Sequence, residues 1–444
     1  MLEILRNATY RTLFMAQLVA LVGTGLATVA LALLAYDIAG AQAGAVLGTA
    51  LAIKMIVYVT LAPLAGAVVS ARLRKPVLIA LDLVRAGAAL TLPFVTEIWQ
   101  VYLLIAVLQS ASAGFTPLFQ SIIPKILPEE RDYTRALSLS RLAYDLESLL
   151  SPALAAALLT VISRHGLFAG TSAGFVLSAL LVLATALPVA ASARTAGSPY
   201  ERAARGIRIY MRTPRLRGLL ALNLCAAAGG AMVFVNTVVL VRGPLQGREG
   251  DVAWALAAFG AGSMAVALLL PRFLDRVADR QVMLAAGTAM SAALFIGSAL
   301  WASVDGAVGW SSVLALWFAM GASYAALVTP GGRLLKRSAD VESLPFLFAA
   351  QFSLSHICWL LAYPLAGWVG STFGLGAALA ALTVLAVVGL LGARALWPKH
   401  DPSVVPHVHP ELPADHPHLA GDADASGSHA HEFRIDELHR RWPG

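Results

Sequence analysis

Long apolar stretches separated by short polar breaks run through the first 398 residues of the chain. A helix crosses a bilayer with about 20 apolar residues, because each residue advances it by about 1.5 Å. Twelve stretches reach this length. They predict membrane-spanning helices at residues 11–36, 44–69, 76–96, 99–123, 136–162, 167–190, 217–241, 251–271, 281–303, 308–331, 344–370 and 373–397.

The longest polar break, residues 191–216, divides these spans into two groups of six that echo each other. Arg11 of the first span matches Arg217 of the seventh at an offset of 206 positions, and Pro152 matches Pro364 at 212. Such repeats are typical of secondary transporters, whose substrate site lies between the repeats near the membrane midplane. We expect an all-α membrane protein with two pseudo-symmetric six-helix bundles at 1–190 and 217–398, a cytoplasmic linker at 191–216 and a cytoplasmic tail at 399–444.

Composition excludes a soluble globular protein. Hydrophobic residues make up 58% of the 444 residues and charged residues only 13%, about half the usual charged share. The first span is too long to be a removable signal peptide. The sequence contains no nucleotide-binding loop of the Gly-x-x-x-x-Gly-Lys-Ser/Thr type, so we expect an ion gradient rather than ATP as the energy source, and no enzymatic activity.

Lysine and arginine collect on one side of the predicted membrane. With the N-terminus inside, 24 of them fall in cytoplasmic loops and ends, whereas Arg164, Arg242 and Arg248 fall outside. Short cytoplasmic loops are enriched in these residues, so both termini are expected in the cytoplasm. The net charge of +7 then reflects topology and indicates no nucleic-acid partner. Cys225 and Cys358 both fall within spans, which argues against a structural disulfide.

Two segments resemble a known family. The stretch SAGFTPLFQSIIPKILPEERDYTRALSLSRLAYDLESLLSPALAAALL, residues 112–159, resembles the span 4 to span 5 region of the small-molecule exporters of the major facilitator superfamily. The tail sequences HVHPELPADHPHL and SHAHEFRIDELHRRW are similar to those of the nickel-resistance exporters of that branch, the NreB type. The resemblance implies a multi-pass protein of the bacterial inner membrane that exports Ni²⁺ by alternating access between the two halves.

The resemblance also implies gate residues in the loops after the second and eighth spans. The family motif Gly-x-x-x-Asp-Arg-x-Gly-Arg-Arg corresponds to GAVVSARLRK at residues 66–75, where Ser70 replaces the acid. The matching loop of the second half keeps its acids and arginines, namely Asp275, Arg276, Asp279 and Arg280. Asp82 and Arg85, one helical turn apart in the third span, form either a gate-side pair or an intrahelical ion pair.

Four ionisable residues lie near the predicted middle of the bilayer, where a charge costs at least about 2.5 to 3.5 kcal/mol. They are Asp145 and Glu147 of the fifth span, Lys54 of the second and His356 of the eleventh. We predict that at least one of the two acids binds a cation or couples to protons, and which one faces the cavity stays open. Paired structural charges are the alternative for both acids and for Lys54. His356 is either a metal ligand opposite the acids or a packing histidine.

Neutral and soft donors are also available along the predicted cavity. They are Asn223, Cys225, Met232, Asn236 and Cys358. Helix packing is the favoured interpretation of these residues, because bundle interfaces use them routinely.

The tail contains eight of the ten histidines, in an arrangement that includes three His-x-His pairs: His400, His407, His409, His416, His418, His429, His431 and His439. Neighbouring imidazoles without a thiol favour nickel, cobalt or zinc over copper(I). The alternative is a low-complexity tail that binds metal only incidentally. The polar composition of the tail predicts disorder, although Ile435, Leu438 and Trp442 have a helical spacing that would let the last turns dock.

Together these features predict an exporter of Ni²⁺, with Co²⁺ or Zn²⁺ as alternative cargo, coupled to protons and without a cofactor. Its partners would be the lipid bilayer, the metal ion and protons. Two other hypotheses stay open at this point: an efflux pump for drugs or siderophores, and a transport-inactive membrane protein that senses or buffers metal through its tail.

Overall fold

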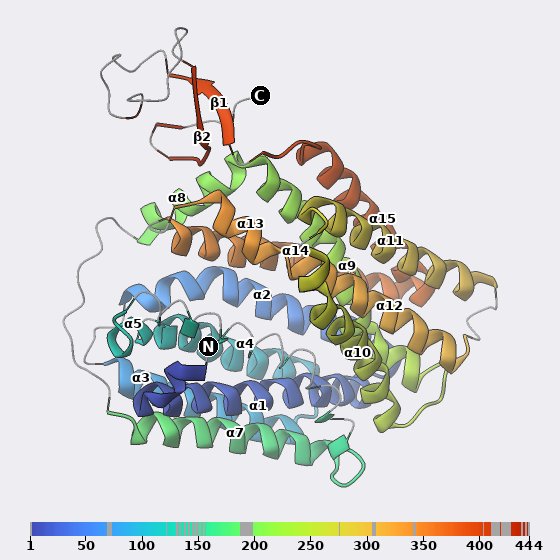
Figure 1. Ribbon diagram of the computed structural model, residues 1–444. Coiled ribbons are helices and arrows are strands. Elements are labelled where there is room, and N and C mark those ends of the chain that lie inside the picture. Colours follow the sequence, from blue (N-terminus) through green and yellow to red (C-terminus); the bar gives the residue numbers. More distant parts are fainter. Residues whose placement is uncertain are drawn as a thin grey trace.

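The structure is a computed structural model that describes residues 2–68, 73–120, 122–129, 132, 135–136, 139–140, 143, 147, 151, 154–155, 157–186, 199–274, 276–303, 308–340, 343–402, 404–409, 418, 428–436, 438–439 and 442. Helices dominate the described residues up to the tail, as the long apolar stretches predict (Figure 1). The all-α fold class is therefore confirmed.

The first half forms one group of helices. It comprises α1 (Ala8–Ala39), α2 (Ala43–Val68), α3 (Arg74–Thr91), α4 (Ile98–Gln120), the short α5 (Ile123–Ile126) and α7 (Arg164–Ala184), with 3₁₀ turns at Leu2–Arg6, Gly40–Gln42 and Leu92–Phe94. α1 begins where the side chain of Asn7 accepts a hydrogen bond from the Tyr10 amide at 3.0 Å. This bond satisfies a backbone donor that has no partner inside the helix.

The second half forms another group. It comprises α8 (Pro199–Arg212), α9 (Pro214–Arg242), α10 (Glu249–Leu274), α11 (Asp279–Ser303), α12 (Trp310–Val328), α13 (Gly331–Ser338), α14 (Leu344–Phe373) and α15 (Leu375–Leu396). α9 begins with a proline, which suits the first helical position because that amide needs no partner. Gly374, with φ of +89°, turns the chain between α14 and α15, a conformation that favours glycine.

Ten segments of the described residues are long and apolar enough to cross a membrane. One of them, Ala8–Leu61, runs through both α1 and α2. About half of the predicted fifth span, 136–162, lies outside the described residues, so the count of twelve spans stays a prediction.

The predicted linker contains a helix. α8 occupies part of the segment predicted as a cytoplasmic linker, and it packs against α14. Arg205 Nη2 donates to Ser343 Oγ at 3.1 Å, and the Tyr210 hydroxyl donates to Gln351. Polarity alone did not reveal this helix, because its stability depends on contacts with a distant part of the chain.

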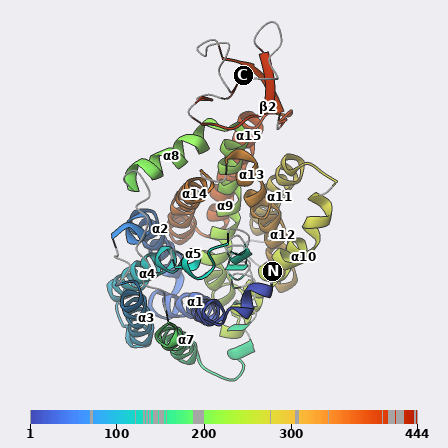
Figure 2. The same cartoon turned by 60° about the vertical axis from the view of Figure 1, so that its left-hand side comes forward.

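The two halves meet along α2 and α14, which lie side by side (Figure 2). These helices run antiparallel, because Gly44 contacts Gly367 whereas Gly48 contacts Tyr363. Glycines make this approach possible: a Cβ on Gly48 would lie 2.6 Å from the carbonyl oxygen of Tyr363, and Gly44 faces Gly367. We call the end of the molecule where α9 begins and α15 ends the tail-side end. The glycine contacts lie toward the other end, which we call the opposite end.

The tail contains a two-stranded antiparallel sheet, β1 (Val404–Val408) and β2 (Ser428–Glu432), in which His407 pairs with His429. Phe433 and Ile435 are only 3% and 4% exposed and belong to the same buried apolar cluster as the helices of the second half. The expectation of disorder therefore does not hold for the described tail residues. The composition argument considered the tail alone, whereas these residues pack on the bundle of the second half.

Candidate functional site

Six tail histidines converge on one small volume. In a β-strand alternate side chains share a face, so His429 and His431 lie on the same face of β2. His407 of β1 pairs with His429 and therefore occupies this face too. His409 follows directly after β1, and His418 and His439 approach from outside the strands. The hairpin register thus turns a sequence repeat into a cluster.

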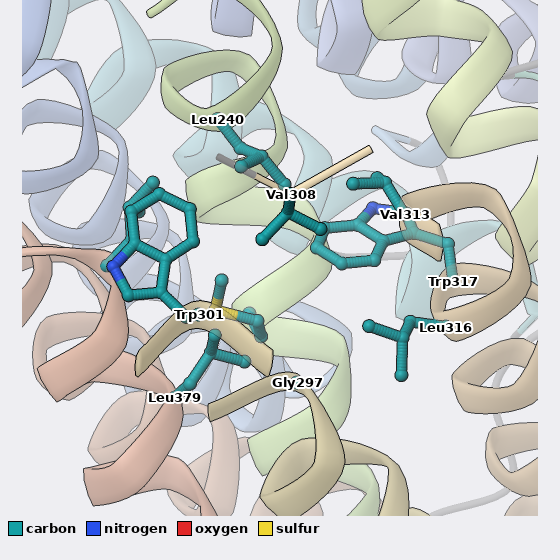
Figure 3. A pocket seen from close by; sticks show the side chains of 10 residues that line it. Leu240, Gly297, Trp301, Val308, Val313, Leu316, Trp317 and Leu379 are labelled. Carbon is teal, nitrogen blue, oxygen red and sulfur yellow. The ribbon is translucent and has the colours of Figure 1, made fainter. Parts of the chain in front are cut away.

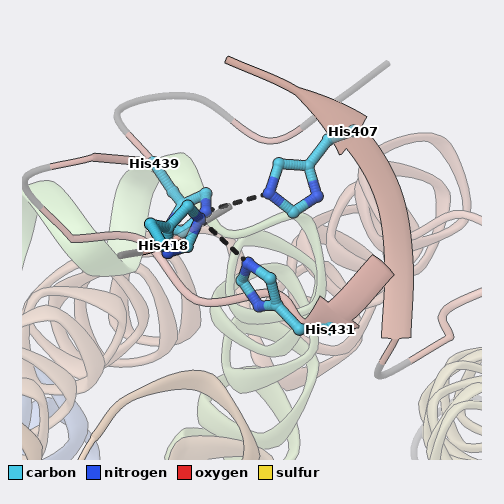
Figure 4. A group of neighbouring side chains, drawn as sticks. All are labelled: His407, His418, His431 and His439. Atoms are coloured by element: carbon cyan, nitrogen blue, oxygen red, sulfur yellow. Dashed lines mark hydrogen bonds between the residues drawn. The ribbon is translucent and has the colours of Figure 1, made fainter. Parts of the chain in front are cut away.

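The ring nitrogens of this cluster lie at distances that suit a shared metal ion (Figure 4). His439 Nε2 lies 3.0 Å from His407 Nε2 and 3.2 Å from His409 Nε2. His418 Nε2 lies 3.1 Å from His429 Nε2 and 3.2 Å from His431 Nε2. Nitrogens bound tetrahedrally at about 2.0 to 2.1 Å from an ion stand about 3.3 Å apart, so these separations match those of a coordination shell.

The histidines form two overlapping sets of four, and within each set all ligand nitrogens lie within 4.8 Å of one another. One set is His407, His418, His431 and His439, and the other is His407, His409, His418 and His429. His407 and His418 belong to both sets. His400 belongs to neither, and His416 lies outside the described residues.

Three of the rings are oriented through their other nitrogen. His407 Nδ1 lies 2.8 Å from the Val405 carbonyl oxygen, His431 Nδ1 lies 2.9 Å from the Glu432 carbonyl oxygen, and His439 Nδ1 lies 2.9 Å from Asp436 Oδ1. An Nδ1–H that donates to such an oxygen leaves the Nε2 lone pair free. Metal-binding histidines are commonly fixed in this way.

The surroundings of the cluster favour neutral imidazole, the form that binds metal. Burial and then the neighbouring imidazoles lower the pKa of His418 to about 4. Burial also lowers the pKa of His407 and of His439, although the Asp436 carboxylate opposes this shift at His439.

A second group of ionisable side chains lies between the two halves. The Lys54 ammonium of α2 interacts electrostatically with the Glu147 carboxylate and with His356 of α14. The Glu147 side chain forms a hydrogen bond with Ser151. It also faces α1, because a Cβ added to Gly25 would lie 2.9 Å from Glu147 Oε1. The structure thus brings together three of the four predicted mid-membrane residues, and the fourth, Asp145, lies outside the described residues.

Tyr58, which the sequence analysis did not single out, completes this group. Lys54 Nζ lies 5.8 Å from the centre of the Tyr58 ring, and the centres of the Tyr58 and His356 rings are 5.5 Å apart. His356 Nδ1 lies 2.6 Å from the Phe352 carbonyl oxygen, which leaves Nε2 available as a ligand. A carboxylate, an imidazole and an ammonium that interact electrostatically form a group able to exchange a cation or a proton.

The neutral candidates pack inside the second half. Cys225 Sγ donates to the Ala386 carbonyl oxygen at 3.0 Å, and Cys358 Sγ lies 3.8 Å from that of Leu220. Asn236 Nδ2 donates to the Ala366 carbonyl oxygen at 3.1 Å. These contacts join α9 to α15 and α14, which agrees with the packing interpretation. Asn223 is 8% exposed, and its Nδ2 has no hydrogen-bond partner among the described residues.

Met232 lines a small apolar cavity between α9, α11, α12 and α15 (Figure 3). Its volume is about 20 Å³, and Trp301, Trp317 and Leu379 are among its walls. Such a space holds about one water molecule. It offers no polar walls to a metal ion, so we assign it no role in binding.

The predicted gate residues fall into two arrangements. Arg85 forms an ion pair with Asp82, which also accepts from Ser178 Oγ at 2.8 Å, and the guanidinium lies 4.2 Å from the centre of the Phe115 ring and 4.5 Å from that of Phe175. This ion pair lies within α3, and its other contacts are with residues of the first half.

In the second half, Asp279 lies 3.6 Å from Arg333 Nε and 3.6 Å from Arg337 Nη1 of α13. Arg280 Nε donates to the Trp397 carbonyl oxygen at 3.0 Å. Arg276 is exposed, and Asp275 lies outside the described residues. The ion pairs therefore join α11 to α13 at the tail-side end.

Two ion-pair centres were missed in the sequence. At the opposite end, Arg164 Nη1 lies 2.7 Å from Asp37 of the first half and 2.7 Å from Glu249 of the second. At the tail-side end, Arg215 Nε lies 3.2 Å from Asp401 Oδ1. Both arginines were attributed to topology alone, and their partners are too far away in sequence for spacing to reveal them.

Comparisons with known proteins agree on the family. The model of the Major Facilitator Superfamily matches residues 13–248. An uncharacterized MFS-type transporter, YfiS of Bacillus subtilis, is 25% identical over 348 residues, which cover 76% of this chain and 82% of the relative. Macrolide efflux protein A of Enterococcus faecalis is 26% identical over 152 residues, 32% of this chain and 47% of that protein.

Solved structures share the fold. The nucleoside transporter NupG superposes with a TM-score of 0.67 at 15% identity, over 87% of this chain and 98% of that one. A bacterial homolog of the human lysosomal transporter Spinster, in an inward-facing conformation, gives 0.65 at 14% identity, over 89% and 99%. Because the family model covers more than half of the sequence and the helices have the same arrangement, the chain is a multi-pass membrane transporter of the Major Facilitator Superfamily.

Proposed function

We propose that this protein exports Ni²⁺ from the cytoplasm and that its tail collects the ion beside the entrance. The observation that carries the proposal is the convergence of six imidazoles in the tail. Imidazole suits nickel, cobalt and zinc, and no thiol or thioether lies in the tail to favour copper(I). In the predicted orientation, the tail-side end faces the cytoplasm.

The proposed transport site is the group formed by Glu147, His356 and Lys54, with Asp145 as a further candidate. A dication held by a carboxylate and an imidazole takes the place of the positive charge that Lys54 supplies in the empty site. Proton binding to the same groups would return the site to its starting state, which favours proton antiport as the energy source.

Everted membrane vesicles test this function, because their cytoplasmic face is outside. With an acidic interior, vesicles that contain the protein should accumulate Ni²⁺, and an ionophore that dissipates the proton gradient should abolish uptake. Mass spectrometry of the vesicles measures the metal, with Co²⁺ and Zn²⁺ in parallel reactions. Equal nickel content in vesicles with and without the protein would contradict export.

A second candidate function is efflux of an organic molecule. It is favoured by the similarity of part of the chain to macrolide efflux proteins. The same vesicles distinguish it, because a labelled macrolide should accumulate in place of nickel and mutation of the tail should not matter. Nickel bound to the vesicles without gradient-dependent uptake would instead indicate a metal buffer.

A further inference from the structure

Arg215 is buried at the tail-side end with help from the tail. It lies in the first turn of α9 and is 1% exposed. Trp442 of the tail covers its guanidinium at 4.9 Å from the ring centre. Its Nη1 and Nη2 have no hydrogen-bond partner among the described residues. A buried guanidinium is unfavourable unless other groups compensate for the lost water, so this contact must be held in place.

Asp401 organises the surface on which the tail rests. Besides its ion pair with Arg215, it accepts from Trp397 Nε1 at 3.2 Å, and its carbonyl oxygen accepts from Arg337 Nη2 at 3.4 Å. This surface therefore joins the start of α9, α13 and the end of α15. We call it the Arg215 surface.

A short chain of ring contacts links the histidine cluster to this surface. Phe433 lies 4.9 Å from the His407 ring and 4.7 Å from the His439 ring, measured between centres. Trp442 lies 5.1 Å from Phe433 and covers Arg215. Phe433 thus contacts both the histidine cluster and Trp442, so the position of Trp442 depends on the order of the cluster.

The tail lacks the means to hold this fold unaided. Segments of this size usually need a disulfide, a metal or a partner to fold, and the two cysteines of the chain lie in α9 and α14. Neutral imidazoles that face one another through their lone pairs gain little without an ion between them. A bound metal supplies both the attraction and the cross-link, as in other small metal-dependent folds.

We infer that metal bound to the histidine cluster docks the tail on the Arg215 surface, and that loss of the metal releases it. This inference rests on metal binding by the tail, which is part of the proposed function, but not on transport. The docking site is well placed for regulation. α8 ends at Arg212 and α9 begins at Pro214, so Arg215 lies at the joint between the linker helix and the second half. The docked tail restrains this joint.

Hydrogen exchange on the full-length protein, with and without Ni²⁺, tests docking directly. A ligand that binds only the folded form slows amide exchange by a factor of one plus its concentration divided by Kd. With nickel at ten times its Kd, exchange in β1 and β2 should therefore slow by about tenfold. The decisive measurement is amide exchange at the start of α9, residues 215–217, and in the segment that contains Phe433 and Ile435. Both should become protected at the same nickel concentration as the strands. Calorimetry on the same samples gives Kd.

Variants separate metal binding from docking. W442A should bind nickel and protect β1 and β2, while the start of α9 no longer responds. H407A should lose both responses. L438A is the matched control, because Leu438 is in the same segment but 37% exposed, and it should behave like the wild type.

Three results would overturn the inference. If nickel binds but exchange at the start of α9 does not change, docking is refuted and metal binding by the tail is not. A wild-type response in W442A has the same consequence. No nickel binding at all refutes docking together with the proposed role of the tail. Nickel-dependent protection without nickel flux in vesicles leaves docking intact and refutes export, so the two failures are distinguishable.

Discussion

At the scale of single residues, the two sets of four histidines share His407 and His418. Each ring offers one nitrogen, and Nδ1 of His407 already contacts a carbonyl oxygen. Both sets therefore cannot be filled at once. We predict that the tail binds one Ni²⁺ per chain, which calorimetry on the purified protein can measure.

The shared histidines should matter most to this binding. H407A or H418A removes a ligand from both sets, so we expect Kd to rise by at least about tenfold, a loss found even for residues that only orient a ligand. H409A or H431A leaves one complete set and should have a smaller effect. H400A is the control, because His400 is in neither set. Equal losses for all these variants would refute the shared arrangement.

Neutralising Glu147 should stop transport without preventing insertion. E147Q would remove a carboxylate that interacts electrostatically with the Lys54 ammonium, and a charge within a span is unfavourable without such compensation. We expect the initial rate of nickel uptake by everted vesicles to fall by more than tenfold at equal protein level. E97Q, which changes an exposed acid, is the control. Full uptake by E147Q would remove this residue from the proposed site.

Residue types were easier to predict than their neighbours. The apolar surroundings of Lys54 and His356 marked them in the sequence, because an ionisable group in a span is unusual. Their contact with Tyr58 could not be predicted, since it depends on the register between α2 and α14. For the same reason, the His-x-His pairs were evident, but the place of His439 beside His407 was not.

At the scale of elements, the β1–β2 hairpin should be sensitive to acid. The folded cluster lowers the pKa of His418 to about 4 from its ordinary 6.5. The unfolded tail thus binds more protons between these values, so the folded tail is most stable above pH 6.5 and loses stability as pH falls through this window.

Calorimetry at a series of pH values tests this sign. We predict that nickel affinity is nearly constant above pH 7 and declines steadily from pH 6.5 toward 4. Burial also lowers the pKa of His407 and of His439 in the same cluster, so both contribute to the change in the same direction. His409, His429, His431 and Asp436 also line the cluster. An affinity that stays constant down to pH 5 would contradict the prediction.

Elements within the bundles followed from local sequence, whereas the linker and the tail did not. A span is long and uniformly apolar, so its neighbours hardly affect its assignment. α8 and the hairpin are polar and short. α8 is stabilised by a hydrogen bond to the distant Gln351, and the tail after the hairpin is stabilised by the contact of Trp442 with Arg215. Composition carries no information about such contacts.

At the scale of the whole molecule, the tail should raise efficiency without being part of the pathway. Deleting residues 402–444 keeps Asp401 beside Arg215 but removes the cluster. Because a tethered site raises the local metal concentration, we expect the apparent KM for nickel to rise by about tenfold while most of the maximal rate remains.

Initial rates in everted vesicles over a range of nickel concentrations measure both parameters. The full-length L438A protein serves as the control for changes in the tail that leave the cluster intact. Loss of transport at every concentration, at normal membrane levels, would place the tail within the transport site itself.

The pseudo-symmetry of the halves was visible in the sequence, but their contact was not. Glycines at positions 44, 48 and 367 were ordinary small residues of a span until α2 and α14 were seen to pack through them. Helix–helix packing in membranes relies on such small residues, and the partner of each becomes evident only in three dimensions.

Arg164 has a further consequence for the route of a cation. It is shared by Asp37 of one half and Glu249 of the other, so it can follow only one of them when the halves separate at the opposite end. In the proposed export of Ni²⁺, the carboxylate that loses Arg164 would then carry its negative charge at the mouth as the positive ion departs. We expect it to slow that departure, and external calcium or magnesium, by occupying it, to lengthen the time the mouth stays open.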